Sequence, residues 1–222
     1  MKNRNIVFIA IVTIVGIAGM SAYAISKNRD GEMMNDNKMM NSSSKSDAVV
    51  QPDKTSADYK MMAAVNGDEY DRLFLANMIS HHQGAVDMAN LALKNAEHQE
   101  VKDLAQAIVS AQTIEINSMV SWQATWGYPA SSGTAMMDHS AMGMENTNAG
   151  MMNALNNKTG DDFDKAFLQQ MIVHHRSAIN MAVSGTNAQH QEVKDLTAAI
   201  ITAQTKEVKE MKQWQKNWGY SN

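Results

Sequence analysis

The sequence predicts an all-α protein, a four-helix bundle built from two repeated helical hairpins. One observation is compositional: 44% of the 222 residues are hydrophobic, with only two prolines and 6% aromatic residues. A β-sheet protein of this size would carry more turn residues and more β-branched alternation. The second observation is an internal repeat over residues 70–128 and 163–220. Both copies contain Phe-Leu-x-x-Met-Ile-x-His-His, then His-Gln-Glu-Val-Lys-Asp-Leu, and end in Trp-Gly-Tyr.

A change of length inside the repeat indicates where each copy turns. The two copies are 93 residues apart at Met78 and Met171 but 92 apart at His98 and His190. A lost residue between these motifs marks a loop, so each copy is expected to be an αα-hairpin. Because one such hairpin can hardly bury its own apolar face, the two copies should pack together as a ferritin-like bundle.

The ends of the four helices carry local signals. The first helix of each hairpin should begin near residues 66–69 and 159–162, where acidic groups follow a capping residue. Asn95 and Asn187 stand where the second helices need their N-caps. The glycine of each Trp-Gly-Tyr fits the left-handed position that ends a helix.

The first 24 residues resemble a targeting segment. Lys2 and Arg4 precede an apolar run, and residues 22–24 have the small-x-small form of a cleavage site. The segment is therefore expected to be a signal peptide or, if uncleaved, an N-terminal membrane anchor. The rest of the chain should lie in the periplasm or another extracytoplasmic space, which agrees with the absence of cysteine.

Methionine is unusually abundant, with 20 residues. Twelve of them fall in two polar segments that are expected to lack structure: a disordered tail (25–65) and a Met-rich linker (129–160), which precede the hairpin repeats 66–128 and 161–222. Core packing does not explain methionines in such segments. These twelve are Met33, Met34, Met39, Met40, Met61, Met62, Met136, Met137, Met142, Met144, Met151 and Met152.

One face of each first helix combines thioethers, imidazoles and a carboxylate. At 100° per residue, two sets share a face: Asp71, Phe74, Met78, His81, His82, Ala85 and Met88, and Asp164, Phe167, Met171, His174, His175, Ala178 and Met181. A single histidine there is more often a hydrogen-bonded core residue. Two adjacent imidazoles are expensive to bury unless something shares their lone pairs, and a metal ion does so.

The predicted metal ligands follow from this pattern and from the linker. They are Met78, His81, His82, Met88, Met171, His174, His175 and Met181 on the helices, and Met136, Met137, His139, Met142 and Met144 in the linker. Thioethers are soft ligands that suit Cu(I) and its mimic Ag(I), and imidazole binds both Cu(I) and Cu(II). Copper, with Cu(I) favoured, is the predicted ion. A rival interpretation, sacrificial oxidation of methionine, leaves the paired histidines unexplained.

Further polar residues have two interpretations each. Gln112, Glu115, Gln204 and Glu207 are either hydrogen-bond partners of the histidines or ordinary polar residues of a bundle. His98 and His190 are either additional ligands or, the interpretation preferred here, surface residues at the turn.

Several functions are excluded or disfavoured. A net charge of −4 argues against nucleic-acid binding. The Glu-x-x-His of di-iron bundles and the His-Glu-x-x-His of zinc proteases are both absent, so the protein is not expected to be an enzyme. A copper-dependent oxidoreductase and a structural or partner-binding bundle remain alternatives. Expected partners are metal ions and other periplasmic copper carriers or exporters, with membrane contact only through residues 1–25 if these are not cleaved.

The run from His81 to Ala89, His-His-Gln-Gly-Ala-Val-Asp-Met-Ala, resembles the bacterial family called domain of unknown function 305. The resemblance covers residues 68–128 and 161–220. It implies a ferritin-like fold, export and, in the Met-rich members of the CopM type, copper binding for resistance or homeostasis. The residues that it carries over as ligands are Met78, His81, His82 and Met88.

The second copy departs from the family motif. Arg176 replaces Gln83 and Asn180 replaces Asp87, which adds a positive charge and removes a negative one. On electrostatic grounds the second copy is expected to hold a cation more weakly than the first.

Overall fold

The computed structural model describes residues 50–130 and 148–220, which form an all-α bundle as predicted. The predicted targeting segment, residues 1–24, lies outside the described residues. The helices are α1 (Ala57–Ala63), α2 (Gly67–Asn95), α3 (Gln99–Trp126), α4 (Asn148–Leu155), α5 (Gly160–Ala182) and α6 (Gln191–Asn217), with a 3-10 turn at Gly185–Asn187. Within these ranges no helix is long and apolar enough to cross a membrane.

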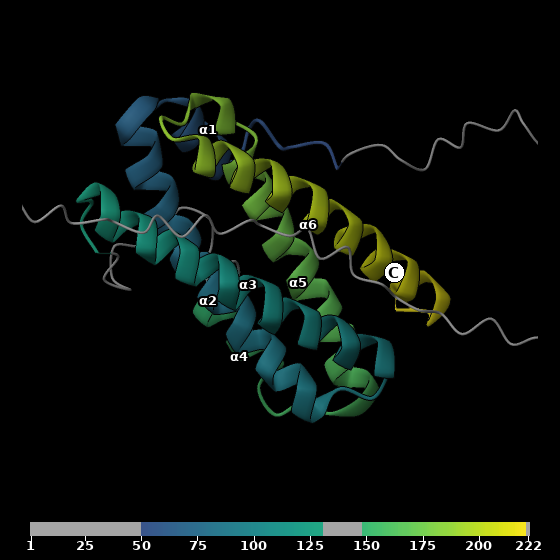
Figure 1. Ribbon diagram of the computed structural model, residues 1–222. Coiled ribbons are helices and arrows are strands. Elements are labelled where there is room, and N and C mark those ends of the chain that lie inside the picture. The colour runs from purple at the N-terminus through teal and green to yellow at the C-terminus, as the bar shows by residue number, and fades with distance from the viewer. Residues whose placement is uncertain (1–49, 131–147, 221–222) are drawn as a thin grey trace, which may run out of the picture. The chain divides into compact units, whose positions relative to one another are not determined.

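The two hairpins pack against each other through their first helices. Helices α2 and α3 form one hairpin and α5 and α6 the other, and α2 contacts α5 (Figure 1). The start of α2, with Phe74, shares a core cluster with Met181 at the end of α5, while Ala92 near the end of α2 clusters with Phe163. Helices α2 and α5 are therefore antiparallel, and their midpoints lie together.

Two short helices occur where the sequence suggested a tail and a linker. Helix α1 lies in the predicted tail 25–65 and α4 in the predicted linker 129–160. Met62 and Leu155 are both fully buried, and they are 93 residues apart, the same offset as Met78 and Met171. The repeat therefore includes these short helices and begins before its first shared sequence motif. A helix of seven or eight residues presents too few apolar positions for its period to be recognised.

These short helices change the explanation of several methionines. Met62 and Met151 are fully buried in the core, and Met61 and Met152 pack against it partly buried. Four of the twelve methionines assigned to unstructured segments therefore fill the core after all. The other eight lie outside the described residues.

Some differences between the repeats follow from which short helix covers them. Helix α1 packs on α5, where Ser177 Oγ donates a hydrogen bond to Asp58 (2.6 Å) and Asn180 accepts one from the backbone before α1. Helix α4 packs on α2, where Gly84 leaves room for the Asn148 amide; a Cβ at Gly84 would lie 2.4 Å from it. Ser177 and Asn180, which replace Gly84 and Asp87 of the first repeat, therefore contribute to the packing of the α1 segment on α5.

The helix ends agree with the sequence prediction at some positions and differ at others. Helices α2 and α5 begin immediately after Asn66 and Thr159, and Gly127 ends α3 in the left-handed conformation (φ 70°). The predicted N-caps at Asn95 and Asn187 are wrong. Asn95 is the last residue of α2 and Asn187 lies in the 3-10 turn.

Buried aspartates from the opposite repeat cap α3 and α6 instead. Asp164 on α5 accepts hydrogen bonds from the backbone N–H of His98 (2.8 Å) and from its Nδ1 (2.7 Å) at the start of α3. Asp71 on α2 accepts the matching bonds from His190 at the start of α6 (2.9 and 2.6 Å). The carboxylates satisfy N–H groups at a helix start and favour its positive end. Each repeat thus completes the helix ends of the other.

We predict that Asp71→Ala and Asp164→Ala each lower the free energy of unfolding by roughly 2–4 kcal/mol, because each leaves buried donors without an acceptor. Urea unfolding followed by circular dichroism would measure the change. Asp162→Ala, at an exposed position in the first turn of α5, is the matched control and should change stability by under about 1 kcal/mol. Equal effects of Asp162→Ala and Asp164→Ala would contradict the interpretation.

Candidate metal centre

The paired histidines of the two repeats meet in the middle of the bundle. The rings of His81 on α2 and His174 on α5 have centroids 3.6 Å apart, and each lies 6.4 Å from the ring of its sequence neighbour, His82 or His175. This follows from the antiparallel packing of α2 and α5. Four imidazoles from two repeats therefore form one cluster, whereas the sequence suggested one site in each repeat.

Two glutamates from the outer helices hold two of these rings. His82 Nε2 donates a hydrogen bond to Glu115 Oε2 on α3, and His175 Nε2 donates one to Glu207 Oε2 on α6, both at 2.6 Å. The two imidazoles are fully buried, while the glutamate side chains are 25% and 22% exposed. The structure thus confirms one of the two interpretations of these glutamates, as hydrogen-bond partners of the histidines.

Several buried polar atoms at this level of the bundle have no hydrogen-bond partner among the described residues. They are Nδ1 of His82 and His175, both ring nitrogens of His174, and Oε1 of Gln112 and Gln204. Buried polar atoms are normally paired. Here the unpaired atoms come from all four long helices, α2, α3, α5 and α6. Most of them offer a lone pair, and a bound cation would satisfy lone pairs of this kind.

The surroundings of His174 keep its ring unprotonated, which is the form that can bind a cation. Burial lowers the pKa of His174 well below its ordinary value, and the nearby His175 and His82 lower it further. A histidine must be unprotonated to bind a metal ion. Protons therefore compete weakly for the His174 lone pair, even in mildly acidic solution.

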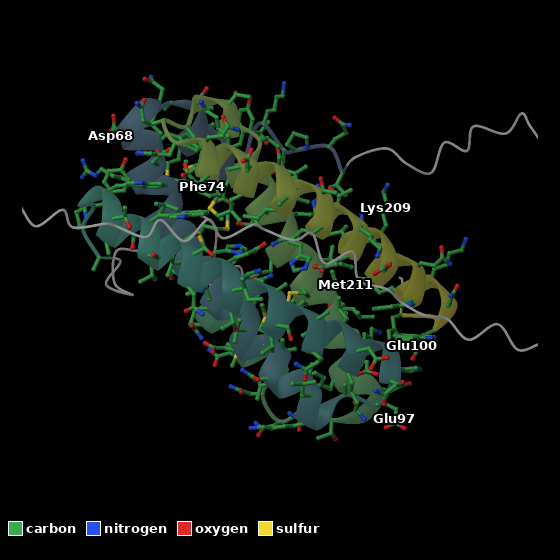
Figure 2. The ribbon with its side chains drawn as sticks, viewed as in Figure 1. Asp68, Phe74, Glu97, Glu100, Lys209 and Met211 are labelled. Atoms are coloured by element: carbon green, nitrogen blue, oxygen red, sulfur yellow. The ribbon has the colours of Figure 1, made fainter. Side chains whose placement is uncertain are left out.

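The helical methionines divide into two groups on either side of the histidines. Met78, Met119 and Met181 belong to one core cluster, and Met88, Met171 and Met211 belong to the other. Each group mixes both repeats, so the predicted partners Met78 and Met88 lie apart. Figure 2 shows Met211 on the inner side of α6 and Lys209 projecting from its outer side. The predicted linker ligands Met136, Met137, His139, Met142 and Met144 lie outside the described residues.

His98 and His190 have a different role from the one that either sequence interpretation gave them. The His98 ring stacks on Trp218 (3.8 Å between centroids) and the His190 ring on Trp126 (3.7 Å), and each ring bonds to a capping aspartate. They hold the ends of the bundle and are separate from the central histidines. The sequence did contain a signal for this role, because both copies have an aspartate, Asp71 or Asp164, on the first helix and Trp-Gly-Tyr after the second. Only the fold shows which histidine, tryptophan and aspartate meet.

The end of the bundle at His98 also contains a group with metal-ligand spacing. Ligand atoms of His98, Asp161 and Asp164 lie within 4.8 Å of one another. Because Asp164 already accepts hydrogen bonds from the start of α3, a cation there would oppose the positive end of that helix. The central histidines remain the stronger candidate.

Comparison with protein families assigns the chain. The model of the family described as Domain of unknown function (DUF305) matches residues 16–119 and 74–215. The chain belongs to the DUF305 family. No curated protein shows significant similarity to it.

Solved structures of this DUF305 protein's relatives include metal-bound forms. CopM in its Cu(I)-bound form is 38% identical, with a TM-score of 0.56 over 67% of this chain and 96% of that one. CopM in its Cu(II)-bound form is 37% identical, with a TM-score of 0.57 over 67% and 97%. A DUF305 protein from Streptomyces coelicolor, described as a candidate secreted protein, is 28% identical, with a TM-score of 0.58 over 66% and 91%.

We predict that the low pKa of His174 makes the metal-free protein less stable in acid. Below about pH 6.5 the unfolded chain binds a proton at this histidine while the folded chain does not, so stability falls as pH falls. His174→Phe removes this effect. Between pH 6.5 and 5.5 its unfolding free energy should fall less than that of the wild type, by up to about 1 kcal/mol. Urea titrations at each pH would test this, and parallel curves would refute it.

Proposed function

We propose that this protein is an extracytoplasmic copper-binding protein that sequesters copper or transfers it through a single buried centre shared by both repeats. The observation that carries the proposal is that His82, His174 and His175, in the ring cluster where α2 and α5 meet, have buried nitrogens with no hydrogen-bond partner among the described residues. Each of these rings is buried, and such lone pairs are stabilised by a cation.

The chemistry of the centre favours a soft ion. The central imidazoles lie between two groups of buried thioethers, which are ligands for Cu(I) and Ag(I), while imidazole also accommodates Cu(II). The Cu(I)-bound and Cu(II)-bound structures of the relative CopM support this assignment. Thioethers need no deprotonation, so their contribution to binding would persist at low pH.

Export and physiological role extend the same proposal. The signal-like start of the chain, the absence of cysteine and the family member described as a candidate secreted protein support a periplasmic location. In that compartment the protein would serve copper resistance or homeostasis, with other copper carriers or exporters as partners. Methionine-rich segments outside the described residues would capture Cu(I) and pass it on by ligand exchange.

We propose binding rather than catalysis. The His82, His174 and His175 rings are buried, so an organic reductant would not contact an ion held by them. A copper-dependent oxidoreductase would instead consume a reductant under air, and a purely structural bundle would bind no copper tightly. Measuring turnover of Cu(I) and of an organic reductant separates these alternatives.

The central test is an anaerobic titration with Cu(I), and in parallel with Ag(I), against a competing chelator. His82→Ala/His175→Ala should weaken binding by about 100-fold or more, because each change removes a ligand. His98→Gln, at the end of the bundle, is the matched control and should bind like the wild type. Wild-type binding no tighter than that of the double variant would refute the proposal.

A shared centre also predicts equal effects from the two repeats. Because His82 and His175 belong to the same cluster and each bonds to a glutamate at 2.6 Å, His82→Ala and His175→Ala should weaken Ag(I) binding by factors that agree within about threefold, under 1 kcal/mol. Independent sites, as the charge difference at Arg176 suggested, would instead leave one high-affinity ion in one variant and not in the other. Competition titrations of both variants would decide between the two arrangements.

A further inference from the structure

The bond between each histidine and glutamate determines which ring nitrogen carries the proton. An ionised carboxylate only accepts hydrogen bonds, so the Nε2 atom that contacts Glu115 must bear the hydrogen in His82. In a neutral imidazole the other nitrogen, Nδ1, then carries the lone pair. The contact between His175 and Glu207 has the same atoms and the same length, 2.6 Å, so the second repeat reproduces this arrangement.

The two nitrogens of each ring face different surroundings. Nε2 meets a glutamate that is about one quarter exposed, whereas Nδ1 is buried and has no hydrogen-bond partner among the described residues. The carboxylate therefore lies on the solvent side of His82 and of His175, and the lone pair lies on the inner side.

We propose that Glu115 and Glu207 are positioning residues that hold His82 and His175 in the Nε2–H tautomer, so that Nδ1 is the atom that binds the soft cation. This inference rests on the proposed function. Histidines that bind metals commonly donate their other N–H to a carboxylate, which fixes the ring orientation and makes the ligand nitrogen more basic. Glu115 and Glu207 supply that acceptor from α3 and α6, helices that do not carry the histidines.

A structural role for these pairs makes a different prediction. If each pair served only to join the two helices of its hairpin, both ring nitrogens should have hydrogen-bond partners. The glutamate would accept the bond from Nε2–H, and another group would donate one to Nδ1. Instead the same nitrogen, Nδ1, is left buried and unpaired in His82 and in His175. Leaving a buried acceptor unsatisfied is destabilising, so its recurrence in both repeats favours a role in binding.

The experiment compares three variants of the full chain. Glu115→Leu/Glu207→Leu removes both acceptors, and Glu115→Gln/Glu207→Gln can still present a carbonyl oxygen to Nε2–H. Glu210→Leu is the control, since Glu210 lies on α6 and pairs with Lys206 at the surface. Circular dichroism and thermal unfolding establish that each variant is folded. Imidazole 15N chemical shifts of the metal-free protein report the tautomer, and competition with a chelator gives the affinity for Ag(I), which does not change oxidation state.

In the wild type, the Gln variant and the Glu210→Leu control, the shifts should show Nε2–H at His82 and His175. The Leu variant should lose this preference and bind Ag(I) about 10- to 100-fold more weakly. Unchanged tautomers, or unchanged affinity in a folded Leu variant, would overturn the inference while wild-type binding stood. A wild type that failed to bind Ag(I) and Cu(I) would overturn the proposed function itself, whatever the tautomers.

Discussion

The burial of imidazole rings between α2 and α5 is the constraint on which the rest of the structure depends. His81 and His174 are in contact where the two antiparallel helices meet, so the helices must lie close at their midpoints. Burial keeps His174 neutral, and neutral rings still have polar nitrogens to satisfy. Glutamates on α3 and α6 satisfy part of this need, which fixes how the outer helices sit on the inner ones.

Each repeat supplies residues that cap the helices of the other and pack in a shared core. Asp164 caps α3 and Asp71 caps α6, although each aspartate belongs to the other hairpin. Helix α1 covers α5, helix α4 covers α2, and both methionine groups draw on both halves. Because the inner faces depend on residues of both copies, neither hairpin would retain the histidine cluster alone.

This exchange also explains why the chemistry of the centre belongs to the pair of repeats. One hairpin supplies two adjacent imidazoles and their glutamate, but the contact of four rings exists only after the hairpins pack. The partly exposed glutamates give the centre a polar connection to solvent, while the thioether groups on either side keep it apolar. A soft, weakly hydrated cation suits that combination.

The sequence by itself determined the helical class, the duplicated hairpins and the histidines and methionines that face inward, because these depend on residue type and helical period. For Glu115 and Glu207 it left two interpretations open, partners of the histidines or ordinary polar residues of a bundle, and the structure decided for the first. The tertiary structure decided which residues come into contact. It joins the histidines of both repeats in one centre, caps α6 and α3 with Asp71 and Asp164, and places in the core several methionines that the sequence assigned to a tail and a linker. These features join residues up to about 119 positions apart in the chain, a separation that no local pattern encodes.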